Sequence, residues 1–184
     1  MRLLASLSSM FVLLATPAFA QSGNPPGMTP DTGPQQPNNP DRLFVHAAAI
    51  GGMAEVEFGG LAEQKTESDA VKGFALRMVE DHSKANDRPI KIAKEDGVAV
   101  PAELDPKHQA KRDRLETLSG VQFDQAYIRG QLVEHQKAAQ LLEYEIGSGQ
   151  DVDLKNFASE FLPIFLQHLQ MAQDVQAELT GSAP

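Results

Sequence analysis

The sequence predicts an all-α fold built from four long helices. Four segments repeat apolar residues at spacings of three and four, and no segment alternates apolar and polar residues as a half-buried strand does. The pattern weakens only between Val98 and Leu118, which separates the four helices into two pairs. Two tight helical hairpins joined by a long crossover is the connectivity of ferritin-like four-helix bundles. We therefore expect a ferritin-like bundle whose crossover carries a short extra helix.

The first twenty residues have the form of a secretory signal peptide. Arg2 supplies the basic start, Leu3 to Ala15 form an apolar run, and Ala18-Phe19-Ala20 match the small-x-small pattern of a cleavage site. The run is shorter than the roughly 20 apolar residues that span a bilayer. We therefore expect cleavage after Ala20, export to the periplasm, and no membrane span in the mature chain.

Residues 21–40 are nearly all Pro, Gly, Gln, Asn, Ser and Thr. Such a segment buries too little apolar surface to offset the entropy lost on ordering, so it is expected to be a disordered linker. The folded domain is then expected over residues 41–180.

The first long helix is expected over about 41–65, with Asp41 as its N-cap after Pro40. Four glycines within it weaken a helix, so we expect them to allow close packing against another helix. They are Gly51, Gly52, Gly59 and Gly60. Its apolar stripe is Leu43, Phe44, Ala47, Ile50, Ala54, Phe58 and Leu61.

The second long helix is expected over about 67–96, ending at Gly97, with a kink at Pro89. Its inward stripe is Val71, Phe74, Ala75, Met78, His82, Ala85 and Ile92. A short helix then follows Asp105-Pro106, an N-cap with proline in the first turn, and continues to Leu118.

The third long helix is expected over about 120–146, opened by a capping box between Ser119 and Gln122. Its stripe is Ile128, Leu132, His135, Ala139, Leu142 and Ile146. The fourth is expected over about 151–179 with Asp151 as its cap and a bend at Pro163. Its stripe is Leu154, Phe157, Phe161, Ile164, His168, Met171, Val175 and Leu179.

Composition excludes several classes of protein. The chain has no cysteine, which rules out disulfides, thiolate metal sites and haem attached through a C-x-x-C-H motif. Its net charge is −9, and loss of Arg2 with the signal makes it more negative. An acidic surface repels phosphate backbones, so we expect no nucleic-acid partner, and the sequence identifies no protein partner.

Three of the five histidines fall on apolar stripes. His82, His135 and His168 belong to the last three long helices, and helix lengths place all three near the middle of the bundle. On the first helix Glu55 lies about one turn from that level, and Glu57 competes with it for the inward position.

Two arrangements satisfy the ring nitrogens of buried histidines. In the first, His82, His135, His168 and Glu55 bind one divalent metal, with copper or zinc as the expected ion. In the second, the rings form a structural hydrogen-bond network with partners that include Tyr127 and Asp81. The methionines Met78 and Met171, near His82 and His168, are expected as supporting residues that pack in the core. The sequence analysis leaves both arrangements open.

The other two histidines are weaker candidates. His108 lies in the polar run DPKHQAKRD, and we expect it to be exposed to solvent. His46 shares a face with Leu43 and Ile50, so it is expected either as an extra ligand or as a half-exposed residue near the helix end.

Several catalytic motifs are absent from the sequence. Di-iron bundles use Glu-x-x-His pairs on two helices, and none occurs here, so a ferroxidase centre is not expected. Nucleophile-base triads and glycine-rich phosphate loops are also missing. The sequence does not decide whether the protein is an enzyme, and it favours a non-enzymatic role.

Four stretches resemble the exported bacterial family known as domain of unknown function 4142. They are AAAIGGMAEVEFGGLA (47–62), FALRMVEDHSKAN (74–86), LSGVQFDQAYIRGQLVEHQKA (118–138) and FLPIFLQHLQMA (161–172). The positions that fit are Glu55, Asp81-His82, Phe123-Asp124, Tyr127, His135, Leu162-Pro163 and His168. The resemblance covers about residues 41–180 and implies a ferritin-like fold and export.

The resemblance carries no reaction with it. Similarity to another exported helical family rich in histidine and methionine suggests handling of copper or another metal, by analogy. The sequence departs from the family pattern at Gly130-Gln131-Leu132, where members often carry a methionine.

Overall fold

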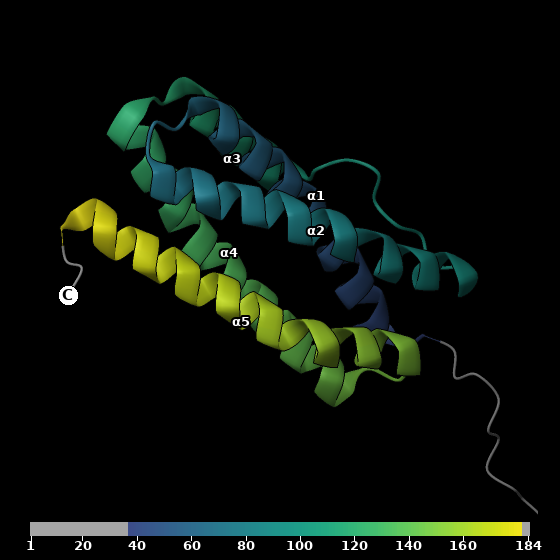
Figure 1. The fold of residues 1–184 in the computed structure, drawn as a ribbon. Helices are drawn as coiled ribbons and strands as arrows, with labels where there is room; N and C mark the ends of the chain where they lie inside the picture. The colour runs from purple at the N-terminus through teal and green to yellow at the C-terminus, as the bar shows by residue number, and fades with distance from the viewer. Residues whose placement is uncertain (1–36, 182–184) are drawn as a thin grey trace, which may run out of the picture. The chain divides into compact units, whose positions relative to one another are not determined.

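The computed structural model describes residues 37–181, which form five α-helices (Figure 1). The helices are α1 (Asn39–Lys65), α2 (Asp69–Glu95), α3 (Pro106–Thr117), α4 (Gly120–Ser148) and α5 (Val152–Thr180). No strand occurs within these residues. The signal peptide and most of the expected linker lie outside the described part of the chain.

The four long helices form two antiparallel hairpins that pack side by side. α1 packs on α2 and α4 packs on α5, while α1 also contacts α4 and α2 contacts α5. The start of α1 lies against the α4–α5 turn, where the Asn38 side chain donates a hydrogen bond to the Ser148 carbonyl at 3.0 Å. α2 and α4 therefore run in the same direction.

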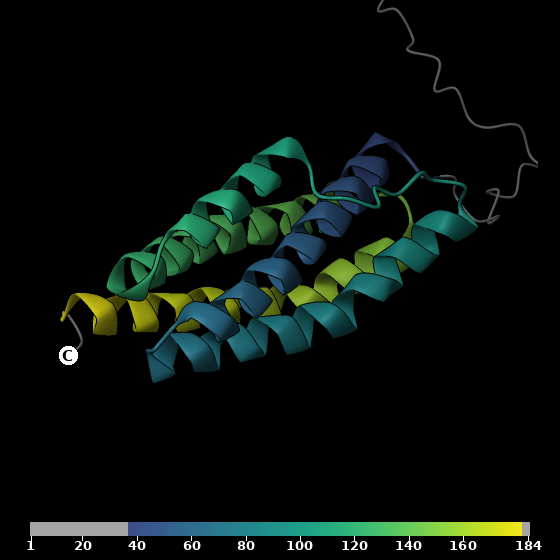
Figure 2. The same ribbon diagram turned by 90° about the horizontal axis from the view of Figure 1, so that it is seen from above.

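The crossover between α2 and α4 follows from this arrangement. Because α2 ends at one end of the bundle and α4 begins at the other, the chain returns along the bundle through residues 96–105 and α3 (Figure 2). α3 packs on α1 and α4. The ferritin-like bundle with a helix in its crossover is confirmed.

Details of the helix ends and faces differ from the sequence-based expectations. α1 begins at Asn39, and its cap is Asn38 in a reciprocal capping box with Asp41, so the expected cap at Asp41 is wrong. Ser119 precedes α4 but makes no side-chain capping bond. Leu43 was expected on the inward stripe, yet its side chain is 63% exposed. α2 and α5 continue through Pro89 and Pro163.

Only two of the four α1 glycines face a neighbouring helix. A methyl group at Gly52 would overlap the Asn86 side chain, and one at Gly59 would lie 2.6 Å from Val79 Cγ2 and 3.2 Å from the Ala75 carbonyl oxygen. At Gly51 and Gly60 it would meet no described atom within 4 Å. The expectation of close packing therefore holds for Gly52 and Gly59.

The core consists of two apolar clusters. The first is Ala54, Phe58, Ala62, Val71, Phe74, Ala75, Met78, Leu104, Leu115, Phe123, Tyr127, Ile128 and Ala172. The second is Phe44, Val45, Ala85, Ala93, Val98, Leu142, Leu154, Phe157 and Ala158. Along α2, α4 and α5 the chain passes from one cluster to the other at His82, His135 and His168, so a layer of imidazoles lies between the two.

A buried carboxyl group lies at the end of the bundle where α1 begins. Glu145 is fully buried, and burial raises its pKa to about 8, with the Asp41 carboxyl and then Asp151 adding to the shift while Lys155 opposes it. Asp41 itself accepts hydrogen bonds from the backbone amides of Gln150 and Asp151 at 2.9 and 3.2 Å. Glu145 is therefore protonated in the folded protein at neutral pH.

The two classes of α1 glycine predict opposite effects of alanine. Gly59→Ala forces α1 away from α2 and is expected to lower the free energy of unfolding by about 1–3 kcal/mol. Gly60→Ala meets no obstacle and gains helix propensity, so it is expected to raise that free energy by up to about 1 kcal/mol. Urea unfolding followed by circular dichroism measures both, and equal effects would contradict the packing described for Gly59.

Glu145 predicts a pH dependence of stability. Its pKa of about 8 lies above the ordinary value of 4.5, so the folded chain holds the proton more tightly and stability falls as pH rises from about 4.5 to 8. Glu145→Gln is expected to remove this fall and to raise the free energy of unfolding at pH 8 by on the order of 1–3 kcal/mol. The exposed neighbour Glu143 gives the control, since Glu143→Gln should leave the urea-unfolding profile unchanged across this range.

Candidate metal centre

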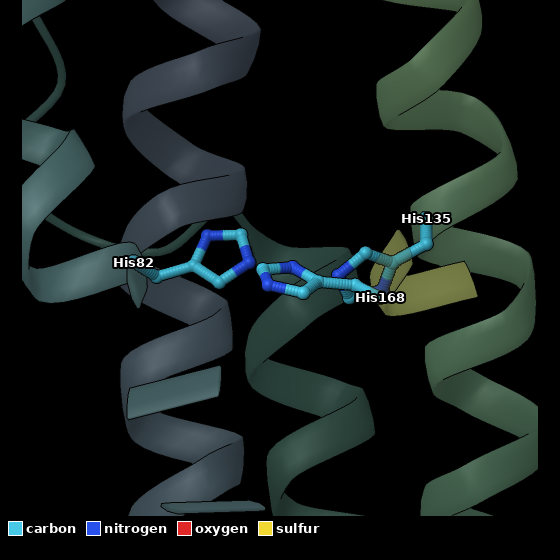
Figure 3. A group of neighbouring side chains, drawn as sticks. All are labelled: His82, His135 and His168. Carbon is cyan, nitrogen blue, oxygen red and sulfur yellow. The ribbon is translucent and has the colours of Figure 1, made fainter. Parts of the chain in front are cut away.

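Three imidazole rings converge between the helices of the bundle. His82 from α2, His135 from α4 and His168 from α5 point toward one another (Figure 3). Their ring centroids lie 5.6 Å (His82–His135), 5.6 Å (His82–His168) and 5.3 Å (His135–His168) apart. The side chains are buried, with exposed fractions of 3%, 1% and 0%. The convergence expected from the three apolar stripes is present in the structure.

Hydrogen bonds fix which nitrogen of two rings carries the proton. His135 Nδ1 lies 3.0 Å from the Gln131 carbonyl oxygen, and His168 Nε2 lies 2.8 Å from Asp81 Oδ2. Both oxygens accept only, so these nitrogens donate and the opposite nitrogen of each ring keeps a lone pair. Bonds of this kind orient the ring and set the tautomer of metal-binding histidines.

The inner nitrogens are buried and have no partner. His82 Nε2, His135 Nε2 and His168 Nδ1 make no hydrogen bond to any of the described residues. A ring nitrogen from each residue lies within 4.8 Å of one from each of the other two. Zinc bonds nitrogen at about 2.0–2.1 Å, which places two ligand nitrogens roughly 3–3.5 Å apart, so small side-chain rotations would bring the three rings onto one ion.

Burial keeps the three imidazoles neutral. It lowers the pKa of His82 to about 3, with His135 and His168 adding to the effect, and it lowers the pKa of His135 to about 4. It also lowers the pKa of His168, although Asp81 opposes the shift. Burial raises the pKa of Asp81, but the hydrogen bonds from His168 and Arg77 outweigh it and hold that pKa below its ordinary value. Neutral imidazole is the form that binds a metal ion.

Asp81 links the site to the surface. Its Oδ2 accepts from His168 and also from Arg77 Nε at 2.5 Å, one turn earlier on α2. Asp81 directly precedes His82 on α2. Its carboxylate binds His168 of α5, while the His82 ring points inward. From the sequence, Asp81 was expected as one partner in a structural network and as a position that fits the family resemblance.

Glu55, not Glu57, faces the interior. Glu57 is exposed and pairs with Arg112 at 3.3 Å. The Glu55 carboxyl is buried, and burial raises its pKa to about 7, while hydrogen bonding with the Gln131 side chain and the charges of His108 and Lys111 oppose the shift. Glu55 is not in the group of mutually close ligand atoms formed by the three histidines. It lines the same cavity as His82 and His135.

Gln131 is the site residue that the sequence analysis missed. Its carbonyl accepts from His135, its side chain bonds to Glu55, and it is 1% exposed. The available signal was its position four residues before His135, which puts it on the same face of α4. Tyr127 lies one turn earlier and is also buried, and its hydroxyl makes no hydrogen bond within residues 37–181.

The remaining candidates lie apart from the three rings. Met78 is buried in the first apolar cluster, and Met171 packs against it. His46 is exposed. The expectation that His108 is exposed is wrong, because its ring stacks on Phe58 at 6.4 Å between centroids and its Nδ1 lies 2.7 Å from Asp105 Oδ1. α3 packs on α1, and this contact buries a residue whose polar neighbours indicated a surface.

Two solved structures share this fold. One is a fragment of a DUF305 protein from Deinococcus radiodurans, 12% identical, with a TM-score of 0.69, where the match covers 78% of this chain and 99% of that one. The other is a DUF305 protein from Streptomyces coelicolor, named as a candidate secreted protein, 16% identical, with a TM-score of 0.66 and coverage of 77% and 92%. At these identities the likeness shows the fold alone.

No match was found among curated proteins. Of the described residues, 37–181, none belongs to a helix long and apolar enough to cross a membrane. The model of the family called domain of unknown function (DUF4142) matches residues 26–175, which begins within the segment expected to be a linker and includes all three histidines. The chain therefore belongs to the DUF4142 family.

Proposed function

We propose that this protein is an exported periplasmic protein that binds one divalent transition-metal ion, copper or zinc, through His82, His135 and His168. The observation that carries the proposal is a buried ring nitrogen without a partner on each of three imidazoles, whose ligand nitrogens come within 4.8 Å of one another. An unsatisfied buried polar atom costs about 1–3 kcal/mol, and three on neighbouring rings are difficult to account for in a purely structural network. A metal ion satisfies all three together.

The surroundings of the rings support binding over a structural role. Each of the two outer hydrogen bonds fixes a ring in the tautomer that points a lone pair inward, as second-shell partners of metal ligands do. The donors are nitrogens without thiolates, which suits zinc and copper and does not select between them. Glu55 is proposed as a nearby carboxylate that supplies negative charge from α1.

Export rests on residues 1–20 and on the folded domain that follows them. This segment has a basic start, an apolar run and a small-x-small cleavage pattern in its sequence. The similarity in fold to a protein named as a candidate secreted protein agrees with export. We propose cleavage after Ala20, a linker that follows it, and a periplasmic metal-binding domain up to about residue 180, which is not a di-iron ferroxidase.

The alternative is a non-enzymatic envelope or stress-response module in which the same histidines stabilise the bundle. The hydrogen bonds of His135 and His168 to Gln131 and Asp81 favour it, because a structural network is built from bonds of this kind. The two functions differ in one measurable property, which is metal content.

Mature protein prepared without a histidine tag is expected to contain one copper or zinc ion per chain by elemental analysis. His82→Ala, His135→Ala and His168→Ala each remove one of three ligands and are expected to weaken binding by about 100-fold or more, measured by competition with a chelator. Glu57→Gln, a change at an exposed carboxylate of α1 that pairs with Arg112 and does not line the cavity beside the histidines, is the control and should leave affinity unchanged. Protein that neither contains metal nor takes up micromolar copper or zinc would favour the structural module.

Asp81 is expected to tune the affinity through His168. Asp81→Asn removes the carboxylate that holds the ring, so metal affinity should fall by about 10–100-fold with the stoichiometry still one. Glu80→Gln is the matched control, because Glu80 is the adjacent residue and pairs with Lys84 on the surface. Isothermal titration of both variants measures this, and equal affinities for the two would show that Asp81 does not act on the site.

A further inference from the structure

A cavity of about 360 Å³ lies beside the three histidines. His82, His135 and Glu55 line it, whereas His168 does not. α1 contributes Gly51, Glu55 and the exposed His46 to its wall, and it contributes no imidazole to the group of three. The cavity therefore reaches the site along the one long helix that supplies no histidine ligand.

The walls of the cavity are mostly apolar. They include Ile50 from α1, Ala85 from α2, Leu142 from α4 and the rings of Phe157 and Phe165 from α5. The Phe165 ring also lies 5.0 Å from the His82 ring between centroids, so apolar surface continues up to the site. A ligand held here would have an apolar body.

The outer edge of the cavity carries cations. Lys107 and Lys137 line it together with Asp105, His108 and Glu134. Glu134 pairs with Lys137 at 3.2 Å and also with Lys111. The positive charge of Lys137 lowers the pKa of Lys107, so the two lysines at this edge repel each other. An approaching anion would relieve this repulsion.

Charge balance at the site also favours an anion. Three neutral imidazoles leave the full charge of a divalent ion in a buried, mostly apolar setting, which is costly unless it is compensated. The Glu55 carboxylate can supply one negative charge. A monoanionic ligand in the cavity would supply the second.

We propose that the metal keeps an open coordination position toward this cavity, and that the cavity binds a small organic monoanion, a carboxylate with a short apolar tail, to the metal. This inference rests on the proposed metal site. Three protein ligands with an exchangeable fourth position is the pattern of metal sites that bind small molecules, whereas structural zinc sites have four protein ligands. In this proposal the bound metal ion itself binds the carboxylate ligand, in addition to being bound by the protein.

Gly51 offers a way to fill the cavity without removing a ligand. It lines the cavity, and a side chain there would begin in space free of described atoms within 4 Å. Gly51→Leu is thus expected to occupy the cavity. Gly60→Leu is the matched control, because Gly60 lies on the same helix, has the same free space and does not line the cavity.

The experiment titrates full-length mature protein loaded with Cu²⁺ with acetate, propionate and butyrate, followed by visible absorption and electron paramagnetic resonance. The copper spectrum is expected to change on binding, and affinity to rise by up to about fourfold for each added methylene. Gly51→Leu should weaken butyrate binding at least tenfold with one copper still bound, while Gly60→Leu matches the unsubstituted protein.

Failure of this inference is distinguishable from failure of the proposed function. If copper binds through the histidines but no carboxylate changes its spectrum, or Gly51→Leu and Gly60→Leu bind butyrate equally, the open position toward the cavity is refuted and the metal site stands. Equal butyrate binding by copper-free protein would also refute it. If Cu²⁺ does not bind to the three histidines, both proposals are overturned.

Discussion

Desolvation of three imidazoles at one level of the bundle is the constraint on which the rest of the structure depends. His82, His135 and His168 interrupt the apolar stripes of three helices, and the core divides into two clusters at that level. The three rings are almost entirely buried, so leaving a polar atom there without a partner is costly. Asp81 and Gln131 meet that need for the outer nitrogens of two rings. The inner nitrogens have no hydrogen-bond partner among residues 37–181, and the lone pairs of His135 Nε2 and His168 Nδ1 attract a cation or a donor.

The topology brings these residues together and keeps them in register. Each hairpin fixes the relative height of its own two helices, and the hydrogen bonds that join the α4–α5 turn with Asn38 and Asp41 fix the height of the first hairpin against the second. Buried glycines on α1 let α2 approach closely enough for its histidine to reach the other two. The contacts at the acidic end of the bundle therefore help to set the register of the histidine layer, although the two lie about two turns or more apart along α4.

The sequence was sufficient for the architecture and for the three histidines, because both follow from helical periodicity over long segments. His82, for example, lies between Met78 and Ala85 on the apolar stripe of α2, and this position can be read from the sequence alone. Features that depend on contacts between helices were not predictable in the same way. His108 lies among polar residues, and only the packing of α3 buries it; Gln131 looks like an ordinary amide until its neighbours on α1 are known. The prediction that Leu43 faces inward was wrong because its spacing fits the apolar stripe, but Phe44 and Val45 occupy the inward positions instead.

The ligand set is divided between the two hairpins, with one histidine on the first and two on the second. Neither hairpin alone can present all three nitrogens, so the centre exists only while the hairpins are docked. An ion bound there would act as a reversible crosslink between halves of the chain that are separated by a long connection. Parting of the hairpins would break the ligand set, so a bound ion would favour the closed bundle over the open one.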